Sequence, residues 1–461
     1  VTVADGALVT SKTDATFSAY NLLAMNGGVI DAPGSVSLTG KGIFTSAGTI
    51  RDASTVTLSA TGGNITANNL SVNATNAITL HATGVVTGDE TSLTSSAASV
   101  SVISDQGQTT LTNALLKALV GDISLSGSTL LNLSGTTINA KNLTASVTGS
   151  TGVLNAENAI LDVSDTLTIS SMGSLNLSAT EDNQGMYDAK TINVTAAGDV
   201  NAAGASFTAT DASVSSTVGQ LLASNTTWTV TNDLSLTAQT NLEVMGSTLS
   251  AKSLTATATT GKLDAQNAVA TVTNATTLAS GTTMNLKSTT AQKGVFASGT
   301  LSANAGTGLD AAGAELTTTT LGLTTTAGDI TLSNATIRAH TAGTIIGKSD
   351  VDISGSTITA GSLSVTATDA TLNAQDAVTT VTNAATLTSG TTMTLSSTQA
   401  GKGTLTAGSL VANAGSDLTA TNAQLTAGTL SATAAQNLSA TGATIKSTGT
   451  TLGLMATNGD L

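Results

Sequence analysis

Cysteine is absent from this 461-residue chain, and proline and aromatic residues are almost absent. Without cysteine no disulfide bond can cross-link the chain, which is compatible with a fold that is held together by packing alone. Aromatic residues make up only 2% of the chain, too few to fill the two or three cores expected of a globular protein of this length. The apolar content comes instead from Ala, Leu, Val and Ile, which suits a narrow interior only a few side chains wide.

Charge is scarce as well. Charged residues are 9% of the chain, with a net charge of −14, and Ser and Thr take their place on the expected surface. No basic run or aromatic platform offers a binding site for nucleic acid, so we expect no nucleic-acid partner. No apolar run reaches about 18 residues, so no transmembrane helix is predicted. The chain begins at Val1 without an initiator Met or a signal-peptide pattern, and we expect a fragment of a longer protein.

What the chain has in abundance is repetition, clearest in residues 408–447. Two 20-residue lines follow one another there, GSLVANAGSDLTATNAQLTA and GTLSATAAQNLSATGATIKS. Within each line, Leu and Ala alternate with Ser and Thr, which is the period-2 pattern of a strand with one buried face. Small or turn-forming residues separate three short strands per line. Stacking these lines predicts an all-β fold, a parallel β-helix of about 20–24 residues per coil and about 22 coils, on the order of 100 Å long.

A longer repeat overlies the short one, and it predicts how the chain is organised. A segment that begins at Lys252 returns at Gly361, an offset of 361 − 252 = 109 residues. We therefore expect one continuous β-helix over 1–461, with blocks of about 109 residues at 252–360 and 361–461 and a weaker copy at 141–251. The leucines at 254, 278, 301 and 321 are expected to mark the starts of successive coils. The run of residues 113–122 has a less clean pattern and is expected to form an irregular coil.

The repeat also predicts which residues face inward. Each buried Leu would contribute roughly 1.5–3 kcal/mol relative to its exposed state. Asn and Asp at corners can bond their own backbone and tolerate left-handed geometry, as expected for Asp122, Asp199, Asp329, Asp417 and Asn437. The predicted structural core comprises Ile192, Val200, Phe207, Leu301, Leu309, Leu316, Leu410, Leu418, Leu425, Leu430, Leu438 and Ile445.

Once per block the spacing between inward residues grows, which predicts an outward loop. The segments SATEDNQGMY, KSTTAQKGVF and SSTQAGKGTL occupy these places. A row of such loops is a candidate contact surface, although solenoids also admit extra residues at corners without any function. The candidate contact residues are Glu181, Asp182, Tyr187, Lys293 and Lys402.

Chemistry-bearing patterns are missing. The acidic residues are scattered, and His81 and His340 lie far apart without neighbours at metal-ligand spacing. No GxxxxGK[ST] phosphate loop and no GGxGxDxUx calcium repeat occurs. We therefore expect no enzymatic activity, no catalytic residues, no cofactor and no metal site.

The repeats carry a family resemblance. Lines such as GSLVANAGSDLTATNAQLTA, KTINVTAAGDVNAAGASFTA and GTLSANAGTGLDAAGAELTT resemble the coils of filamentous haemagglutinin-type exoproteins of the two-partner secretion route. The resemblance implies a right-handed parallel β-helix shaft, an outer-membrane transporter as partner, and a secreted or cell-surface location in a Gram-negative bacterium. Neither the family's secretion domain nor an Arg-Gly-Asp receptor motif is present, so the chain would correspond to shaft.

Three functions remain open at this point. The first is a structural and adhesive shaft of a surface exoprotein, whose ligand would lie on a host cell, a bacterial cell or a matrix. The second is a filament or sheath subunit that associates with itself end to end or laterally, because β-helix ends and Thr-rich faces permit such contacts. The third, a polysaccharide-active enzyme, would need a cluster of carboxylates on one face.

Overall fold

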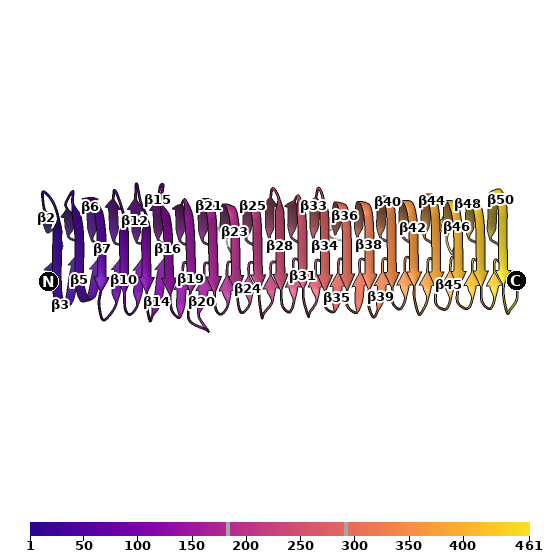
Figure 1. Cartoon of the computed structure of the whole chain (residues 1–461), viewed down its shortest axis with the longest axis horizontal. Coiled ribbons are helices and arrows are strands. Elements are labelled where there is room, and N and C mark those ends of the chain that lie inside the picture. Colours follow the sequence, from indigo (N-terminus) through magenta and orange to yellow (C-terminus); the bar gives the residue numbers. More distant parts are fainter. Residues whose placement is uncertain (181–184, 290–293) are drawn as a thin grey trace. The chain divides into compact units, whose positions relative to one another are not determined.

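The protein is a parallel β-solenoid, described here from a computed structural model that covers residues 1–180, 185–289 and 294–461. The described residues form 50 strands and no helix, and every strand pairing is parallel. About 21 coils of about 21 residues each are present, which confirms the predicted fold class. The right-handed sense stays a prediction. The chain divides into two compact units, unit 1 (Val1–Thr231) and unit 2 (Asn232–Leu461), each described by itself. Figure 1 labels the strands of both units.

The strands of unit 1 are β1 (Thr2–Val3), β2 (Leu8–Thr10), β3 (Ala15–Asn26), β4 (Val29–Asp31), β5 (Ser35–Ser46), β6 (Thr49–Ala53), β7 (Thr55–Ala60), β8 (Ile65–Asn68), β9 (Ser71–Ala74), β10 (Ile78–Ala82), β11 (Val86–Asp89), β12 (Ser92–Ser95), β13 (Val100–Ser104), β14 (Gln108–Thr112), β15 (Leu115–Ala118), β16 (Asp122–Gly127), β17 (Leu130–Asn132), β18 (Thr137–Ala140), β19 (Asn142–Val147), β20 (Val153–Asn155), β21 (Ile160–Ser171), β22 (Leu175–Asn176), β23 (Met186–Ala196), β24 (Val200–Asn201), β25 (Ser206–Ser216), β26 (Leu221–Leu222) and β27 (Thr227–Val230).

The strands of unit 2 are β28 (Asp233–Ala238), β29 (Leu242–Glu243), β30 (Thr248–Ala251), β31 (Ser253–Ala258), β32 (Leu263–Asp264), β33 (Val269–Val272), β34 (Ala275–Ser280), β35 (Thr283–Asn285), β36 (Val295–Ala305), β37 (Gly308–Asp310), β38 (Glu315–Thr325), β39 (Asp329–Thr331), β40 (Thr336–Gly347), β41 (Val351–Asp352), β42 (Thr357–Ala367), β43 (Leu372–Asn373), β44 (Val378–Ser389), β45 (Met393–Thr394), β46 (Thr404–Ala414), β47 (Leu418–Thr419), β48 (Gln424–Ala434), β49 (Leu438–Ser439) and β50 (Thr444–Ala456).

Each coil has three faces, which we call A, B and C in chain order. In unit 2, β28, β31 and β34 begin face A, β29 and β32 begin face B, and β30 and β33 begin face C. From β36 onward one long strand supplies face C of one coil and face A of the next, bending between them. The turn between faces B and C, called the B–C corner below, is the place where the described chain of unit 2 adopts left-handed geometry.

The inward residues stack in register, because alternate residues of each strand point to the same side. Leu410, Leu430 and Leu452 lie opposite one another in successive coils, as do Leu418 and Leu438. The predicted pairing of the two 20-residue lines is therefore observed. The resulting core is aliphatic, with Leu, Ile, Val and Ala buried in coil after coil.

The predicted coil starts contain one error of register. Leu254 lies opposite Thr276 and not opposite Leu278, which pairs with Ala256 and Ala303. Thr276 is buried in the position expected for a leucine. A slip of two residues keeps every side chain on its own face, so the alternation of the sequence cannot reveal it.

The stretch expected to be irregular is also regular. Residues 113–122 contain β15, whose Leu116 is fully buried and lies opposite Leu93 and Ile138. The apolar run had obscured the pattern because Leu115 and Leu119 on the outward side are apolar too.

Three aromatic rings interrupt the aliphatic core of unit 1. Tyr187, Phe207 and Trp228 occupy the same inward place in β23, β25 and β27, and all three are buried. Their ring centroids are 4.9 Å apart for Tyr187 and Phe207 and 4.0 Å apart for Phe207 and Trp228, in stacked geometry. In-register stacking of coils thus turns isolated aromatic residues in the sequence into a continuous column.

Candidate functional site

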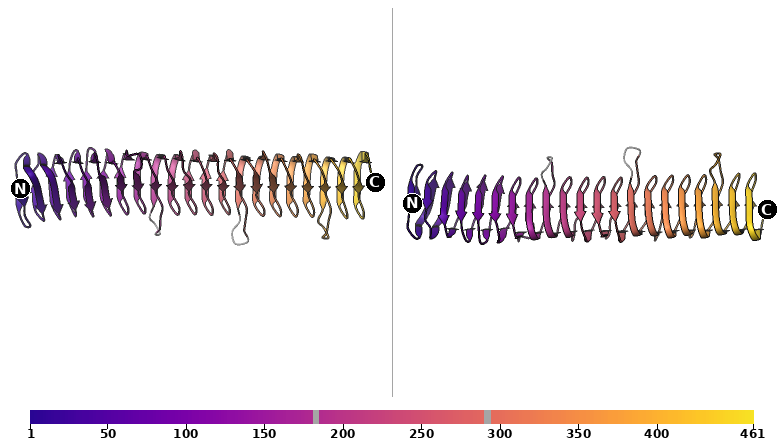
Figure 2. Two further views of the ribbon diagram at one scale, coloured as in Figure 1. Left: turned by 90° about the horizontal axis from the view of Figure 1, so that it is seen from below. Right: turned by 90° about the horizontal axis from the view of Figure 1, so that it is seen from above.

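At the B–C corner an inserted segment recurs in the sequence with the 109-residue period, and the structure describes the whole of the one at 397–403. The segment begins after Thr180, Thr289 and Thr398, and the arithmetic of the spacing is 289 − 180 = 398 − 289 = 109. The last of these loops projects from the body of unit 2 near the yellow end of the chain (Figure 2). We call these three segments the corner loops. Their repetition at one corner makes them the candidate contact site.

Each corner loop is anchored by the coil before it. Asn158, Asn267 and Asp376 precede the loops by one coil and have φ values of 58°, 58° and 59°. Their side-chain Oδ1 atoms accept the backbone N–H groups of Thr180 at 2.8 Å, Thr289 at 2.8 Å and Thr398 at 2.7 Å. Asn and Asp are the non-glycine residues that best tolerate left-handed geometry, and here the same residue also supplies the acceptor for the next coil.

The anchor at Asp376 makes further hydrogen bonds to the loop. The hydroxyl of Thr398 donates to Oδ2 of Asp376 at 2.5 Å, and the N–H of Gln399 donates to Oδ1 at 3.3 Å. These hydrogen bonds, first the hydroxyl and then the backbone N–H of Thr398, lower the pKa of the Asp376 carboxyl. Asn158 adds a different contact, because its Nδ2 donates to the hydroxyl of Thr180 at 2.8 Å.

Within the loop of residues 397–403, local hydrogen bonds define a compact turn. The hydroxyl of Ser397 donates to the carbonyl of Gln399 at 2.8 Å, and the N–H of Lys402 donates to the same carbonyl at 3.2 Å. The chain returns at Gly403, whose φ of 60° suits glycine. The loop borders a hollow of about 260 Å³ whose side-chain lining is polar, from Ser397, Thr398, Gln399, Lys402, Asn422 and Gln424.

The predicted contact residues meet different outcomes. Lys402 lies in the loop and is half-exposed, whereas Glu181, Asp182 and Lys293 fall outside the described residues. Tyr187 is not a contact residue, because it is buried with 1% of its surface exposed. Its hydroxyl lies 2.8 Å from the carbonyl of Ala156 and 3.0 Å from that of Leu177, and burial raises the pKa of this phenol.

The predicted core residues lie in the interior, with one exception. Ile445 is half-exposed in β50, because it is paired with Leu425 on one side and no described strand pairs with the other side. The residues that are buried are Ile192, Val200, Phe207, Leu301, Leu309, Leu316, Leu410, Leu418, Leu425, Leu430 and Leu438.

Corner Asp and Asn residues act between coils, which corrects the expectation that they bond their own backbone. Asp199, Asp329 and Asp417 accept the N–H groups of Gln220, Asp350 and Asn437 in the following coil. Asn437 in turn accepts the N–H of Asp460, and Asp122 accepts Nδ2 of Asn142. None of these five residues has a positive φ. Among the described residues, positive φ values lie at the B–C corner, where no particular residue had been predicted, with the exception of Asp52 in β6.

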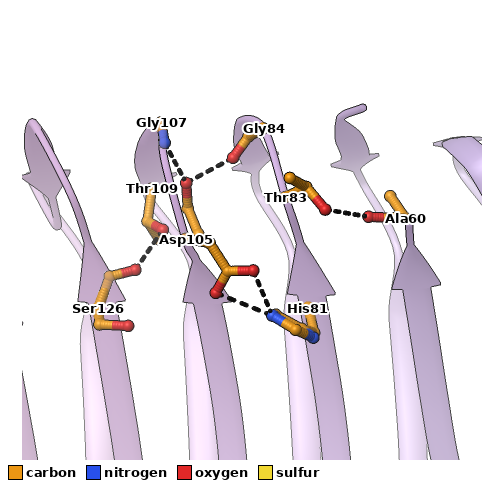
Figure 3. A network of polar contacts seen from close by, with 9 residues as sticks. Ala60, His81, Thr83, Gly84, Asp105, Gly107, Thr109 and Ser126 are labelled. Atoms are coloured by element: carbon orange, nitrogen blue, oxygen red, sulfur yellow. Dashed lines mark hydrogen bonds and ion pairs between the residues drawn. The ribbon is translucent and has the colours of Figure 1, made fainter. Parts of the chain in front are cut away.

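One histidine has a carboxylate partner. Nε2 of His81 on β10 lies 3.0 Å from both carboxylate oxygens of Asp105, which follows β13 in the next coil (Figure 3). Both side chains are half-exposed, and neighbouring Thr83 and Thr109 donate to backbone carbonyls of other coils. The pair lacks a third group or an adjacent nucleophile among the contacts of the described residues, so its geometry fits a surface link between coils.

Acidic side chains are dispersed over the described surface. In unit 1, Asp162 and Asp188 face each other in adjacent coils, and the pKa of Asp188 is raised, first by partial burial and then by Asp162. No group of three or more His, Asp or Glu side chains within 1–180, 185–289 and 294–461 could hold a metal ion. The described residues also include no helix long and apolar enough to cross a membrane.

Comparison with known proteins identifies no relative: no family model, no curated protein and no solved structure matches this chain.

The anchor residues were missed by the sequence analysis, although a signal for them exists. Asn158, Asn267 and Asp376 lie in the segments LNAENA, LDAQNA and LNAQDA, which align at the 109-residue period. An Asn or Asp in the same place of all three copies, one coil before each insertion, would have pointed to the anchor.

Proposed function

We propose that the chain is a structural and adhesive shaft of a secreted surface exoprotein, in which the solenoid displays the corner loops as contact points. The observation that carries this proposal is the anchoring of all three loops by an Asn or Asp of the preceding coil. Such an anchor orders the start of the loop in advance, which lowers the entropic cost of binding.

The spacing of the loops supports the same proposal. Thr289 and Thr398 in unit 2 occupy the same corner five coils apart, which corresponds to roughly 24 Å at about 4.8 Å per coil. Two loops at such a distance can engage one cell surface together, and binding at two points raises the overall avidity well above that of each loop. Location at the surface of a Gram-negative bacterium remains part of the proposal and follows from the family resemblance.

Adhesion is tested with fluorescently labelled full-length chain on a monolayer of cultured epithelial cells. In the test variant, residues 397–403 and their equivalents 179–185 and 288–294 are each replaced by Gly-Ser, the pair that forms the loop-free corner at Gly355 and Ser356. The matched control carries Lys348→Ala and Lys446→Ala outside the loops. We expect the loopless variant to lose at least about tenfold in binding while the control binds like the parent.

Two results would contradict the proposal. The first is equal binding by the parent and the loopless variant, which would leave the loops without a role in contact. The second is the absence of binding by the parent together with continuous fibres in electron micrographs, which would favour a self-assembling filament subunit.

A further inference from the structure

Face A of unit 2 is a long surface almost free of charge. It comprises the outward side chains of β28, β31 and β34 and of residues 300–305, 320–325, 342–347, 362–367, 384–389, 409–414, 429–434 and 451–456. Its two inner columns, which begin at Ser235 and Thr237, carry no charged side chain from β28 to β50. The outer column contains one, Asp233 at its start.

The side chains on this face are small and mostly hydroxylated. One inner column runs through Thr255, Thr277, Ser302, Thr344, Ser364 and Thr386 in successive or nearby coils. The hydroxyls of these six residues make no hydrogen bond within the part of the chain that the structure describes, so they are free to bind an external partner. The face is thus rich in hydrogen-bonding groups that are not used within the described chain.

Apart from Asp233, the charges of unit 2 lie on its other faces and corners. Glu243, Asp264, Asp310 and Asp352 point outward in the register of face B. Face C carries Glu315 and Arg338, whose side chains pair at 3.2 Å. Lys262 pairs with Glu243 and Asp264, and Lys287 pairs with Asp310. A second copy that approached face B would have to desolvate these charges, whereas one that approached face A would not.

We infer that face A of unit 2 is a self-association surface that binds face A of a second copy of this chain. Two identical faces share one coil spacing, so the ridges of one can lie between the ridges of the other along the whole contact, as in paired sheets of small side chains. A partner of another kind would have to match this spacing independently. The contact is isologous and closes into a dimer with two-fold symmetry.

The area of the face fits a stable dimer. Ten steps of about 4.8 Å give a length of roughly 48 Å, and six residues at about 3.3 Å give a width of roughly 20 Å. Each copy would therefore contribute about 950 Å², against about 800 Å² per partner in a standard stable interface. Ile346, Val411 and Met455 are exposed on this face by 38%, 36% and 52%, and their burial would add an apolar contribution.

Sedimentation velocity of the full-length chain over a wide concentration range tests the inference. The test variant combines Thr277→Glu, Thr344→Glu and Thr386→Glu on face A. The matched control combines Thr271→Glu, Thr317→Glu and Thr380→Glu on face C, so that both variants gain the same charge. We expect a reversible dimer for the parent and the control, and at least about tenfold weaker association for the face A variant.

A second measurement keeps the test valid if three charges disturb folding. The chain contains no cysteine, so a spin label on the single variant Thr344→Cys reports only contacts between copies. We expect strong dipolar coupling between labels at dimer concentrations, and none for Thr317→Cys, which lies on face C.

A parent protein that stays monomeric at every concentration would contradict the dimer. A monomeric parent that adsorbs to insoluble cellulose would contradict it too, because face A would then bind a polysaccharide and not a second copy. Equal weakening by the face A and face C variants would also overturn it. The inference does not depend on adhesion by the corner loops, because the cell-binding assay and sedimentation score the two claims separately.

Discussion

Two corners of unit 2 start from the same geometry and end differently. Asn334 and Asp376 both sit at the B–C corner with φ values of 56° and 59°. The coil after Asn334 continues with Gly355, whereas the coil after Asp376 leaves the corner in the loop of residues 397–403. The difference lies in how the next coil meets the side chain of the Asn or Asp.

A Cβ on Gly355 would stand 2.5 Å from Oδ1 of Asn334, far closer than atoms can approach. The same relation holds for Gly135 above Asn113 and for Gly442 above Asn422, at 2.5 and 2.4 Å. At Asp376, the equivalent oxygen is met by the N–H of Thr398 instead. In unit 2, the coil above a left-handed Asn or Asp therefore shows one of two solutions, a glycine or an inserted segment whose N–H donates a hydrogen bond.

The largest loss of stability is expected when a charge replaces a buried leucine of face B next to either corner. Leu418 stacks on Met393 beneath the loop, and Leu372 stacks on Val351 beneath the glycine corner. Leu418→Asp and Leu372→Asp should each destabilise unit 2 by about 3 kcal/mol or more, because each buries an unpaired charge. Urea unfolding followed by far-UV circular dichroism measures this cost. Thr419→Asp, on the outward side of β47, is the control, and a Leu418→Asp variant that unfolds like the parent would show the inward assignment to be wrong.

A medium effect is expected from Gly355→Ala. The variant suffers both the strain of a left-handed Ala, about 1–2 kcal/mol, and the clash with Asn334. Gly401→Ala is the matched control, because Gly401 has a φ of 76° but no atom within 4 Å of a built Cβ. The free energy of unfolding measured in urea should therefore decrease more for Gly355→Ala than for Gly401→Ala. The double variant Asn334→Gly with Gly355→Ala should recover the difference, and a failure to recover it would refute the steric rule.

The smallest effect is expected on the hydrogen bonds between Asp376 and the corner loop when the pH is lowered. The pKa of Asp376 is lowered from its ordinary value of 3.8, so its bonds to the loop are complete above that value and are lost as the pH falls through the lowered pKa. The corner loop at Thr398 should loosen in acid, whereas Asp376→Asn should remove this pH dependence and leave an anchor like that of Asn267. Hydrogen exchange of the Thr398 and Gln399 amides, compared between parent and variant at each pH, measures the effect. An identical acid response in both proteins would assign it to another group.

Much of the fold could be predicted from the sequence because the alternation of apolar and polar residues directly reports which face of a strand is buried. The 20-residue lines that contain Leu410 and Leu430 gave the right stacking partner, and the longer spacing before Leu405 correctly indicated an extra segment at one corner.

What could not be predicted depends on neighbours in the adjacent coil. A buried Thr276 in place of a leucine shifted the apparent register by two residues without changing the pattern. Tyr187 was counted among the contact residues because it ends the inserted segment SATEDNQGMY, yet it lies in the core, where two backbone carbonyls accept hydrogen bonds from its hydroxyl. Whether the side chain of a corner Asn or Asp forms a hydrogen bond with its own backbone or with the next coil likewise depends on the position of the adjacent coil, which the local sequence does not show.

Engineered cysteine pairs test the central claim, the in-register stacking of coils, most directly, because the chain has no native cysteine. Thr255 lies opposite Thr277 on face A in the structure, whereas the register expected from the leucines would place it opposite Ala279. A disulfide spans about 4.4–6.8 Å between Cα atoms, so it can join directly opposite residues but not residues displaced by two. We predict that Thr255→Cys with Thr277→Cys forms an intramolecular disulfide on mild oxidation and that Thr255→Cys with Ala279→Cys does not. The reverse result, or no disulfide in either variant, would contradict the stacking described here.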